Sequence, residues 1–261
     1  MRRSPDRGST PAPAVFLVGA LWCALVSGLG CASAPSDRPA PVGRTVRDWS
    51  DPARTRWDGS GTRPLQTTIW YPAVPGARET ATSIGPPGLP FFRFGWVAPE
   101  APMAALPERL PVILLSHGTG GSALDLSWLA EPLAARGHLV AAVTHHGNSI
   151  AADDLAPQGF YLWWERARDL TQILERLERD SAFGDRLDLG RVGAAGFSLG
   201  GHTVVLLGGA RVDLAAFRAR CEEPDALASS CQPPPEGTSP PTTTSMASHC
   251  ATPMATARSR C

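Results

Sequence analysis

One stretch constrains the fold of this chain more than any other: a serine in a tight turn between two apolar segments. The turn is Gly196-Phe-Ser-Leu-Gly200, with the apolar run from Arg191 before it and the segment to Gly208 after it. A G-x-S-x-G turn that joins a strand to a helix raises the serine hydroxyl above a sheet. We therefore predict that Ser198 is a nucleophile and that the helix N-terminus beside it offers amide groups to an oxyanion. The alternative is a glycine-rich turn with an incidental serine.

Further apolar runs upstream have the pattern of buried strands. Pro111 to Ser116 and His138 to Thr144 are continuous apolar segments, as expected of strands that are covered on both faces. Helices are predicted from Leu124 to Arg136 and from Trp163 to Leu177, where apolar residues recur at steps of three and four. This alternation predicts an α/β fold with a doubly wound, mostly parallel sheet.

The segment before these runs is less regular. A strand is predicted from Leu65 to Tyr71, and the many Pro and Gly residues from Ala73 to Leu110 fit no period. An aromatic patch lies in this irregular segment, at Phe91, Phe92, Phe94 and Trp96. We expect the patch to pack onto the surface of its own domain; the alternative is an exposed loop that binds acyl chains.

Two polar loops follow predicted strands and should meet the turn of Ser198. They are His117-Gly-Thr-Gly-Gly121 and His145-His-Gly-Asn-Ser149, and loops at the carboxyl ends of parallel strands converge on one crevice. His117, His145 and His146 are therefore candidate pocket residues, although we expect His117 mainly to order its loop. A phosphate cradle is disfavoured, because the chain has no lysine to complete a P-loop.

These motifs together resemble the α/β-hydrolase superfamily. Within it, they are most similar to an exported bacterial branch known as predicted dienelactone hydrolases, which is related to platelet-activating-factor acetylhydrolases. The strand end at Ile69 to Pro72 and the loop at His145 to Ser149 also resemble that branch. The resemblance covers about residues 63 to 232.

The resemblance implies hydrolysis of a small-molecule carboxylic ester through an acyl-enzyme on Ser198. The amides of Thr119 and Leu199 would form the oxyanion hole. No metal and no organic cofactor are implied. A cysteine nucleophile is common in true dienelactone hydrolases, so the serine favours esterase chemistry.

The catalytic acid and base of this fold follow the nucleophile in the chain, and we find no convincing candidates there. After Ala228 the sequence has no Leu, Val, Ile, Phe, Trp or Tyr, and His249 follows no apolar run. We therefore expect an incomplete hydrolase domain at residues 63–232 that lacks its C-terminal strands, and a disordered tail at 233–261. A frameshift or premature stop is the preferred explanation. The alternatives are a non-catalytic, membrane-anchored binding or scaffold protein and a partner chain that completes the sheet.

The N-terminal segment predicts export. Residues 1–31 have a basic start and an apolar core, and the sequence around Cys31 resembles a lipoprotein signal whose cysteine is lipidated. Such a chain would be anchored in the membrane and face the periplasm or cell surface; ordinary cleavage after Ala34 would release it. Residues 32–62 are expected to be a tether, and Cys221 and Cys231 to close a small disulfide loop.

The charge balance bears on partners. The formal net charge is zero and all 24 basic residues are arginine. No basic block interleaved with aromatic residues is present, so we do not expect nucleic acid as a partner. The sequence carries no signal for an oligomeric state.

Overall fold

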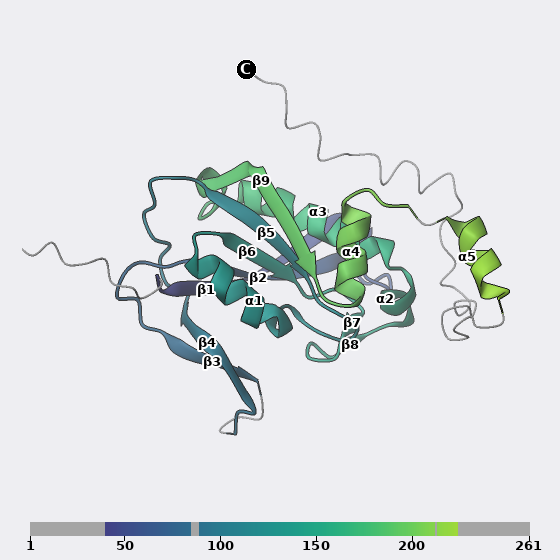
Figure 1. The fold of residues 1–261 in the computed structure, drawn as a ribbon, viewed down its shortest axis with the longest axis horizontal. Coiled ribbons are helices and arrows are strands. Elements are labelled where there is room, and N and C mark those ends of the chain that lie inside the picture. The colour runs from purple at the N-terminus through teal and green to yellow at the C-terminus, as the bar shows by residue number, and fades with distance from the viewer. Residues whose placement is uncertain (1–39, 85–88, 212, 224–261) are drawn as a thin grey trace, which may run out of the picture. The chain divides into compact units, whose positions relative to one another are not determined.

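A seven-stranded mixed sheet forms the centre of the molecule (Figure 1). The computed structural model describes residues 40–84, 89–211 and 213–223. The strand order is β3-β4-β1-β2-β6-β5-β9, which leaves β3 and β9 at the two edges. The strands are β1 (Val42–Thr55), β2 (Thr62–Pro72), β3 (Thr80–Ile84), β4 (Phe92–Pro99), β5 (Leu110–Ser116), β6 (Leu139–Val143) and β9 (Leu187–Gly196).

Helices and a small two-stranded ribbon complete the described part. The helices are α1 (Ser127–Ala135), α2 (Pro157–Tyr161), α3 (Trp164–Arg179), α4 (Leu199–Leu207) and α5 (Leu214–Cys221), with 3-10 turns η1 (Ala123–Leu126) and η2 (Gly184–Arg186). The ribbon pairs β7 (Asn148–Ser149) with β8 (Asp154–Leu155).

The parallel half of the sheet is the half that positions the candidate site. β6, β5 and β9 lie side by side and run parallel, and β2 joins β6 in the antiparallel direction. Val112 and Leu114 of β5 pack with α3, through Leu170, Ile173 and Leu177. Leu115 faces the other side with α1. The predicted α/β fold with buried central strands between helices is confirmed.

The predicted tether at residues 32–62 is wrong from Val42 onward, because this segment contains β1. Eleven of the fourteen residues of β1 pair with β2 in a long antiparallel ladder. The strand is rich in charged residues, which suggested a solvated linker. Its charges have partners instead: Arg47 lies 3.0 Å from Asp180, and Arg54 lies 2.8 Å from Glu165.

The segment from Ala73 to Leu110, predicted to be irregular, contains the β3–β4 hairpin. One face of the hairpin packs on α1, where a Cβ added to Gly95 would lie 2.2 Å from Glu131 Oε2. Phe91, Phe92 and Trp96 are 66%, 68% and 55% exposed, so their predicted packing onto the domain surface is wrong. The hairpin's inner face is already filled by α1, and these aromatic side chains are left in solvent. The side chain of Phe94 lies outside the described residues.

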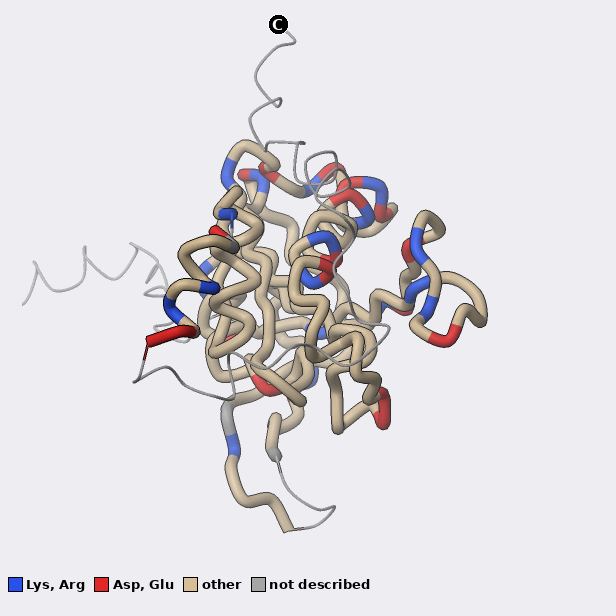
Figure 2. Tube along the Cα trace, turned by 90° about the vertical axis from the view of Figure 1, so that its right-hand side faces the viewer, with Lys and Arg blue, Asp and Glu red and all other residues tan. Residues whose placement is uncertain are grey.

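Charges of both signs are interspersed along the chain (Figure 2). Within the described ranges no helix is long and apolar enough to cross a bilayer. Residues 1–39 and 224–261 lie outside the description, so the signal segment, Cys31, Cys231 and the tail stay predictions. Cys221, at the end of α5, is disulfide-bonded, and its pairing with Cys231 also stays a prediction.

Candidate active site

Ser198 lies between the end of β9 and the first turn of α4, as predicted for the strand–turn–helix. It is the N-cap of α4, with φ 53° and ψ −120°. A positive φ is strained for a residue with a Cβ and is found at functional sites. A Cβ at Gly200 would lie 1.8 Å from the carbonyl oxygen of Ser116, so the turn requires glycine there. The result is an exposed serine held at a helix N-terminus.

The loop from His117 to Gly121 follows β5, the strand next to β9, and lies against the turn of Ser198. A Cβ at Gly118 would lie 3.3 Å from the Cβ of Ser198. The amide of Gly120 donates to Asn148 Oδ1 at 2.8 Å. In the described part of the chain, the amides of Thr119 and Leu199 have no hydrogen-bond acceptor, as the first amide of a helix ordinarily lacks one. The two predicted oxyanion donors thus belong to adjacent segments.

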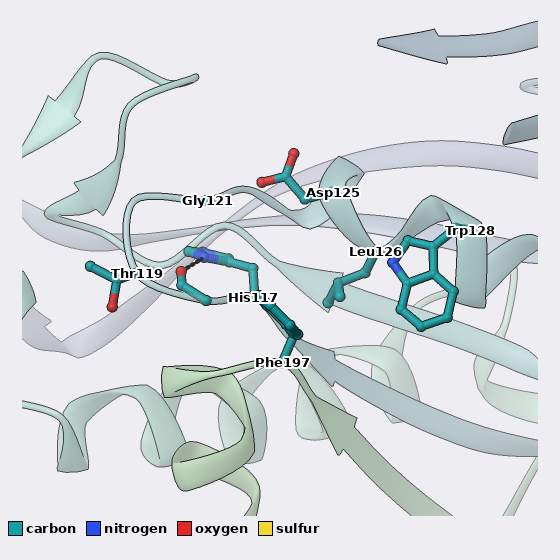
Figure 3. A pocket seen from close by; sticks show the side chains of 8 residues that line it. His117, Thr119, Gly121, Asp125, Leu126, Trp128 and Phe197 are labelled. Atoms are coloured by element: carbon teal, nitrogen blue, oxygen red, sulfur yellow. Dashed lines mark hydrogen bonds between the residues drawn. The ribbon is translucent and has the colours of Figure 1, made fainter. Parts of the chain in front are cut away.

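A pocket of about 260 Å³ opens beside this loop (Figure 3). In Figure 3, Thr119 lies at one end and Trp128 at the other, with His117 and Phe197 between them. Trp128 and Phe197 are largely exposed. Ser198 does not line the pocket, but the residue before it, Phe197, does. The lining residues are His117, Gly118, Thr119, Gly121, Asp125, Leu126, Trp128 and Phe197.

His117 is the only one of the three predicted histidines that lines this pocket, and its hydrogen bonds fix the loop. Nε2 accepts from the amide of His145 at 3.0 Å, and Nδ1 donates to the carbonyl of Gly118 at 2.7 Å. Burial, together with the nearby positive charge of Arg166, lowers the pKa of His117 to about 4. A neutral imidazole with both nitrogens occupied orders the loop and is not free to act as a base.

The prediction that His145 and His146 line the pocket is wrong, because both side chains turn into the protein. His145 is fully buried. The nitrogen atoms of the His146 ring contact Asp154 and the amide of Trp57, with Nδ1 2.7 Å from Asp154 Oδ2. Neither lines the pocket. Burial lowers the pKa of each, most strongly that of His145.

The structure contains a serine–histidine–aspartate chain that the sequence analysis missed. Ser116 Oγ donates to His145 Nε2 at 2.9 Å, and His145 Nδ1 donates to Asp169 Oδ2 at 2.9 Å. All three residues are 0% exposed, so no substrate reaches Ser116. The chain has the bonding pattern of a catalytic triad and serves as a buried support below the loop of His117.

Asp169 anchors this support through two arginines from the first strands. Arg63 donates to both of its carboxylate oxygens, at 2.8 and 3.0 Å, and Arg54 lies 2.8 Å from Oδ1. Burial by itself raises the pKa of Asp169, but Arg63, His145 and Arg54 together hold it well below its usual range. The signal in the sequence was Arg166 and Asp169 on the apolar stripe of α3, with Leu170 and Ile173, where charged residues are rarely found without partners.

No described histidine or carboxylate forms a hydrogen bond with the Ser198 hydroxyl. His202, one turn further along α4, is half-buried and lies edge-on to Trp163 at 5.4 Å between ring centroids. Its Nδ1 is buried without a partner. His202 therefore packs against Trp163 and forms no hydrogen bond with Ser198 among the described residues.

Comparisons with known proteins agree with this geometry. The family model of platelet-activating factor acetylhydrolase, isoform II, matches residues 96–158. A solved ferulic acid esterase from Streptomyces cinnamoneus is 31% identical, with a TM-score of 0.54 over 67% of this chain and 57% of that chain. The chain thus spans little more than half the length of that esterase, and no curated protein matches it. A strand–serine–helix turn beside a glycine loop on a mixed sheet, in a chain similar to an esterase, gives this chain the α/β-hydrolase fold.

Proposed function

We propose that the chain carries the nucleophile and oxyanion hole of a serine esterase that acts on small-molecule carboxylic esters. Ser198 Oγ attacks the ester carbonyl, its proton passes to a base, and the ester C–O bond breaks to release the alcohol and leave an acyl-enzyme. Water then cleaves the acyl-enzyme and frees the acid. The observation that carries this proposal is the strained φ of Ser198 at the N-terminus of α4.

The amides of Thr119 and Leu199 are the proposed donors to the oxyanion. They lie on adjacent segments and have no acceptor in the described part of the chain. In hydrolases one such donor contributes about 3–4 kcal/mol of transition-state stabilisation. These donors are backbone groups, so their placement depends on the fold of the loop and the helix.

The pocket favours an apolar group next to the ester. Leu126, Trp128 and Phe197 contribute apolar surface, and His117 is neutral at pH 7. An aromatic ring fits between such side chains, and the related solved structure is a ferulic acid esterase. We infer that an aryl or short apolar acyl group is preferred.

Labelling of Ser198 tests the proposal. A fluorophosphonate probe should modify the chain at Ser198, located by peptide mass spectrometry, and Ser198→Ala should abolish the modification. We expect slow turnover of p-nitrophenyl acetate, because no described base contacts Ser198 and a general base contributes about 10²–10⁴-fold. Rapid hydrolysis that survives Ser198→Ala would refute the role of this serine.

The second candidate is a non-catalytic binding protein on the same fold, which the lack of a base beside Ser198 favours. Such a protein would bind an ester such as ethyl ferulate, measured by calorimetry, equally well after Ser198→Ala. It would also resist the probe. Labelling of the unaltered chain excludes this candidate.

We also propose that the chain is exported and anchored through a lipid on Cys31. The support is the signal-like sequence of residues 1–31. The mature protein should appear in the membrane fraction and Cys31→Ser should appear in the soluble fraction. An unchanged distribution would contradict the anchor.

A further inference from the structure

Arg166 is a buried cation whose hydrogen bonds, among the described residues, are all with neutral groups. It is 1% exposed, and its hydrogen bonds reach four oxygen atoms on three segments of the site. Its Nε donates to Thr203 Oγ1 at 3.1 Å. The other acceptors are Asn148 Oδ1 at 3.3 Å, Ser116 Oγ at 3.4 Å and the carbonyl oxygen of His117.

This environment differs from that of the other buried arginines near it. Arg54 and Arg63 both contact the carboxylate of Asp169. Arg166 lies one turn before Asp169 on α3, yet no ion pair joins them among the described residues. A buried charge without a contacting counter-ion is costly, and burial lowers the pKa of Arg166 to about 10. Packing alone gives no reason for a guanidinium at this position.

The acceptors of Arg166 lie beside both proposed oxyanion donors. On the loop side, Asn148 Oδ1 also accepts from the amide of Gly120, the residue after Thr119. On the helix side, the Thr203 hydroxyl that accepts from Arg166 donates to the carbonyl of Leu199 at 2.9 Å. The guanidinium of Arg166 therefore links a partner of the Gly120 amide, which is next to Thr119, to a partner of the Leu199 carbonyl on α4.

We propose that Arg166 is a positioning residue that couples the loop of His117 to Gly121 to helix α4 and so sets the separation of the two oxyanion donors. The catalytic part of this inference rests on the proposed esterase function. The structural part, that a change on α4 alters the loop, does not depend on the esterase function.

The test is Thr203→Val, which removes the acceptor of Arg166 on α4 and nearly preserves the shape of the side chain. Thr203 belongs to α4, so a purely local role would disturb α4 alone. The matched control is Thr171→Val on the exposed side of α3, where the hydroxyl also bonds the carbonyl four residues earlier, that of Ala167 at 3.3 Å. Thr203→Ser, which keeps the hydroxyl, should behave as the unaltered chain.

Amide hydrogen exchange of residues 117–121 is the primary measurement. A lost hydrogen bond to a charged group should speed exchange in this loop about tenfold in Thr203→Val, with no change in Thr171→Val or Thr203→Ser. Unchanged exchange in the loop of a folded Thr203→Val would overturn the coupling. If Thr203→Val does not fold, Thr203→Ala gives the same comparison without a bulkier apolar group.

Fluorophosphonate labelling of Ser198 separates the two proposals. If the oxyanion donors move apart, the maximal rate of labelling should fall about tenfold in Thr203→Val while the probe concentration at half-maximal rate stays the same. Failure to label the unaltered chain contradicts the esterase function, and the exchange result still decides the coupling. A raised half-maximal concentration with an unchanged maximal rate would show that Arg166 shapes the pocket and not the oxyanion hole.

Discussion

At the scale of single residues, the candidate site depends on places where backbone meets backbone. The first turn of α4 lies so close to the end of β5 that Gly200 has no room for a side chain. The amide of Phe197 also donates to the carbonyl of Ser116 at 3.2 Å. The nucleophile and its supporting strand are thus in direct backbone contact, which makes their separation sensitive to one methyl group.

Replacement of Gly200 by Ala should therefore destabilise the protein strongly. The new Cβ would lie 1.8 Å from a carbonyl oxygen, and the required backbone shift should cost about 3 kcal/mol or more. Urea unfolding followed by circular dichroism measures the change. The matched control is Gly193→Ala on β9, where nothing lies within 4 Å, and we expect a change within about 0.5 kcal/mol. Equal effects of the two substitutions would contradict the packing argument.

At the scale of elements, the β3–β4 hairpin has one buried face and one exposed aromatic face. Val97 is 1% exposed and belongs to the cluster around α1, whereas its neighbour Trp96 is 55% exposed. The alternation of side chains along a strand produces this contrast. An exposed aromatic face on an edge hairpin is an aggregation hazard.

Substitutions of Trp96 and Val97 should affect different properties: the first should change aggregation, and the second should change stability. Trp96→Ser should reduce binding of the dye ANS and light scattering at high concentration, with a stability change within about 0.5 kcal/mol. Val97→Ser places a hydroxyl in the core and should destabilise the protein by about 2–3 kcal/mol. A large loss of stability in Trp96→Ser would show that this face is packed in solution.

The elements that could be predicted from sequence are those whose pattern follows from burial alone. β5 and β6 are continuous apolar runs, and α3 has an apolar stripe, so their types and approximate bounds follow from periodicity. β1 could not be predicted, because two of its arginines are paired with residues more than a hundred positions away: Arg47 with Asp180 and Arg54 with Glu165. β4 contains a glycine and ends in a proline, β3 is only five residues long, and the pairing of the two strands is a tertiary feature.

The same limit applies to the candidate site. The turn of Ser198 and the loop at His117 are local motifs, and both lie where the sequence predicts. The apolar stripe of α3 signals that Asp169 is buried, but its partner could not be predicted, because Arg63 and Asp169 are separated by 106 positions. The positions of His145 and His146 after a strand predict pocket residues, but no local pattern shows which way their side chains turn.

At the scale of the whole molecule, the buried polar cluster joins parts of the chain that are far apart in sequence. Arg54 comes from β1, Arg63 from β2, Asp169 from α3 and His145 from the loop after β6. Removing one member leaves a buried charge without its partner, which is more costly than never having formed the pair. The cluster therefore makes the stability of the described fold depend on protonation.

Stability should decrease as the pH falls from about 6.5 to about 4. The pKa of His117 is lowered from 6.5 to about 4 in the folded protein, and that of His145 is lowered as well. In this range the unfolded chain binds protons that the folded chain does not, so stability rises with pH by about 1 kcal/mol per pH unit for each histidine. Chemical unfolding at several pH values measures the slope.

A substitution identifies the groups behind this slope. His117→Gln should reduce the slope by about 1 kcal/mol per pH unit, because one of the buried histidines with a lowered pKa, the others being His145 and His146, no longer takes up a proton on unfolding. Below about pH 4 the lowered pKa of Asp169 should produce a further loss in both proteins. A slope that is the same in both proteins between pH 6.5 and 4 would show that His117 is not responsible.

The position of β9 at the edge of the sheet has a consequence for Ser198. Among the described strands β9 pairs with β5 alone, so the direction of the strand that carries the serine is fixed from one side. A further strand that bonded to the open side would change the twist of β9 and, with it, the axis of α4. The rate at which a small reagent reacts with Ser198 should therefore change when another strand pairs with the open edge of β9.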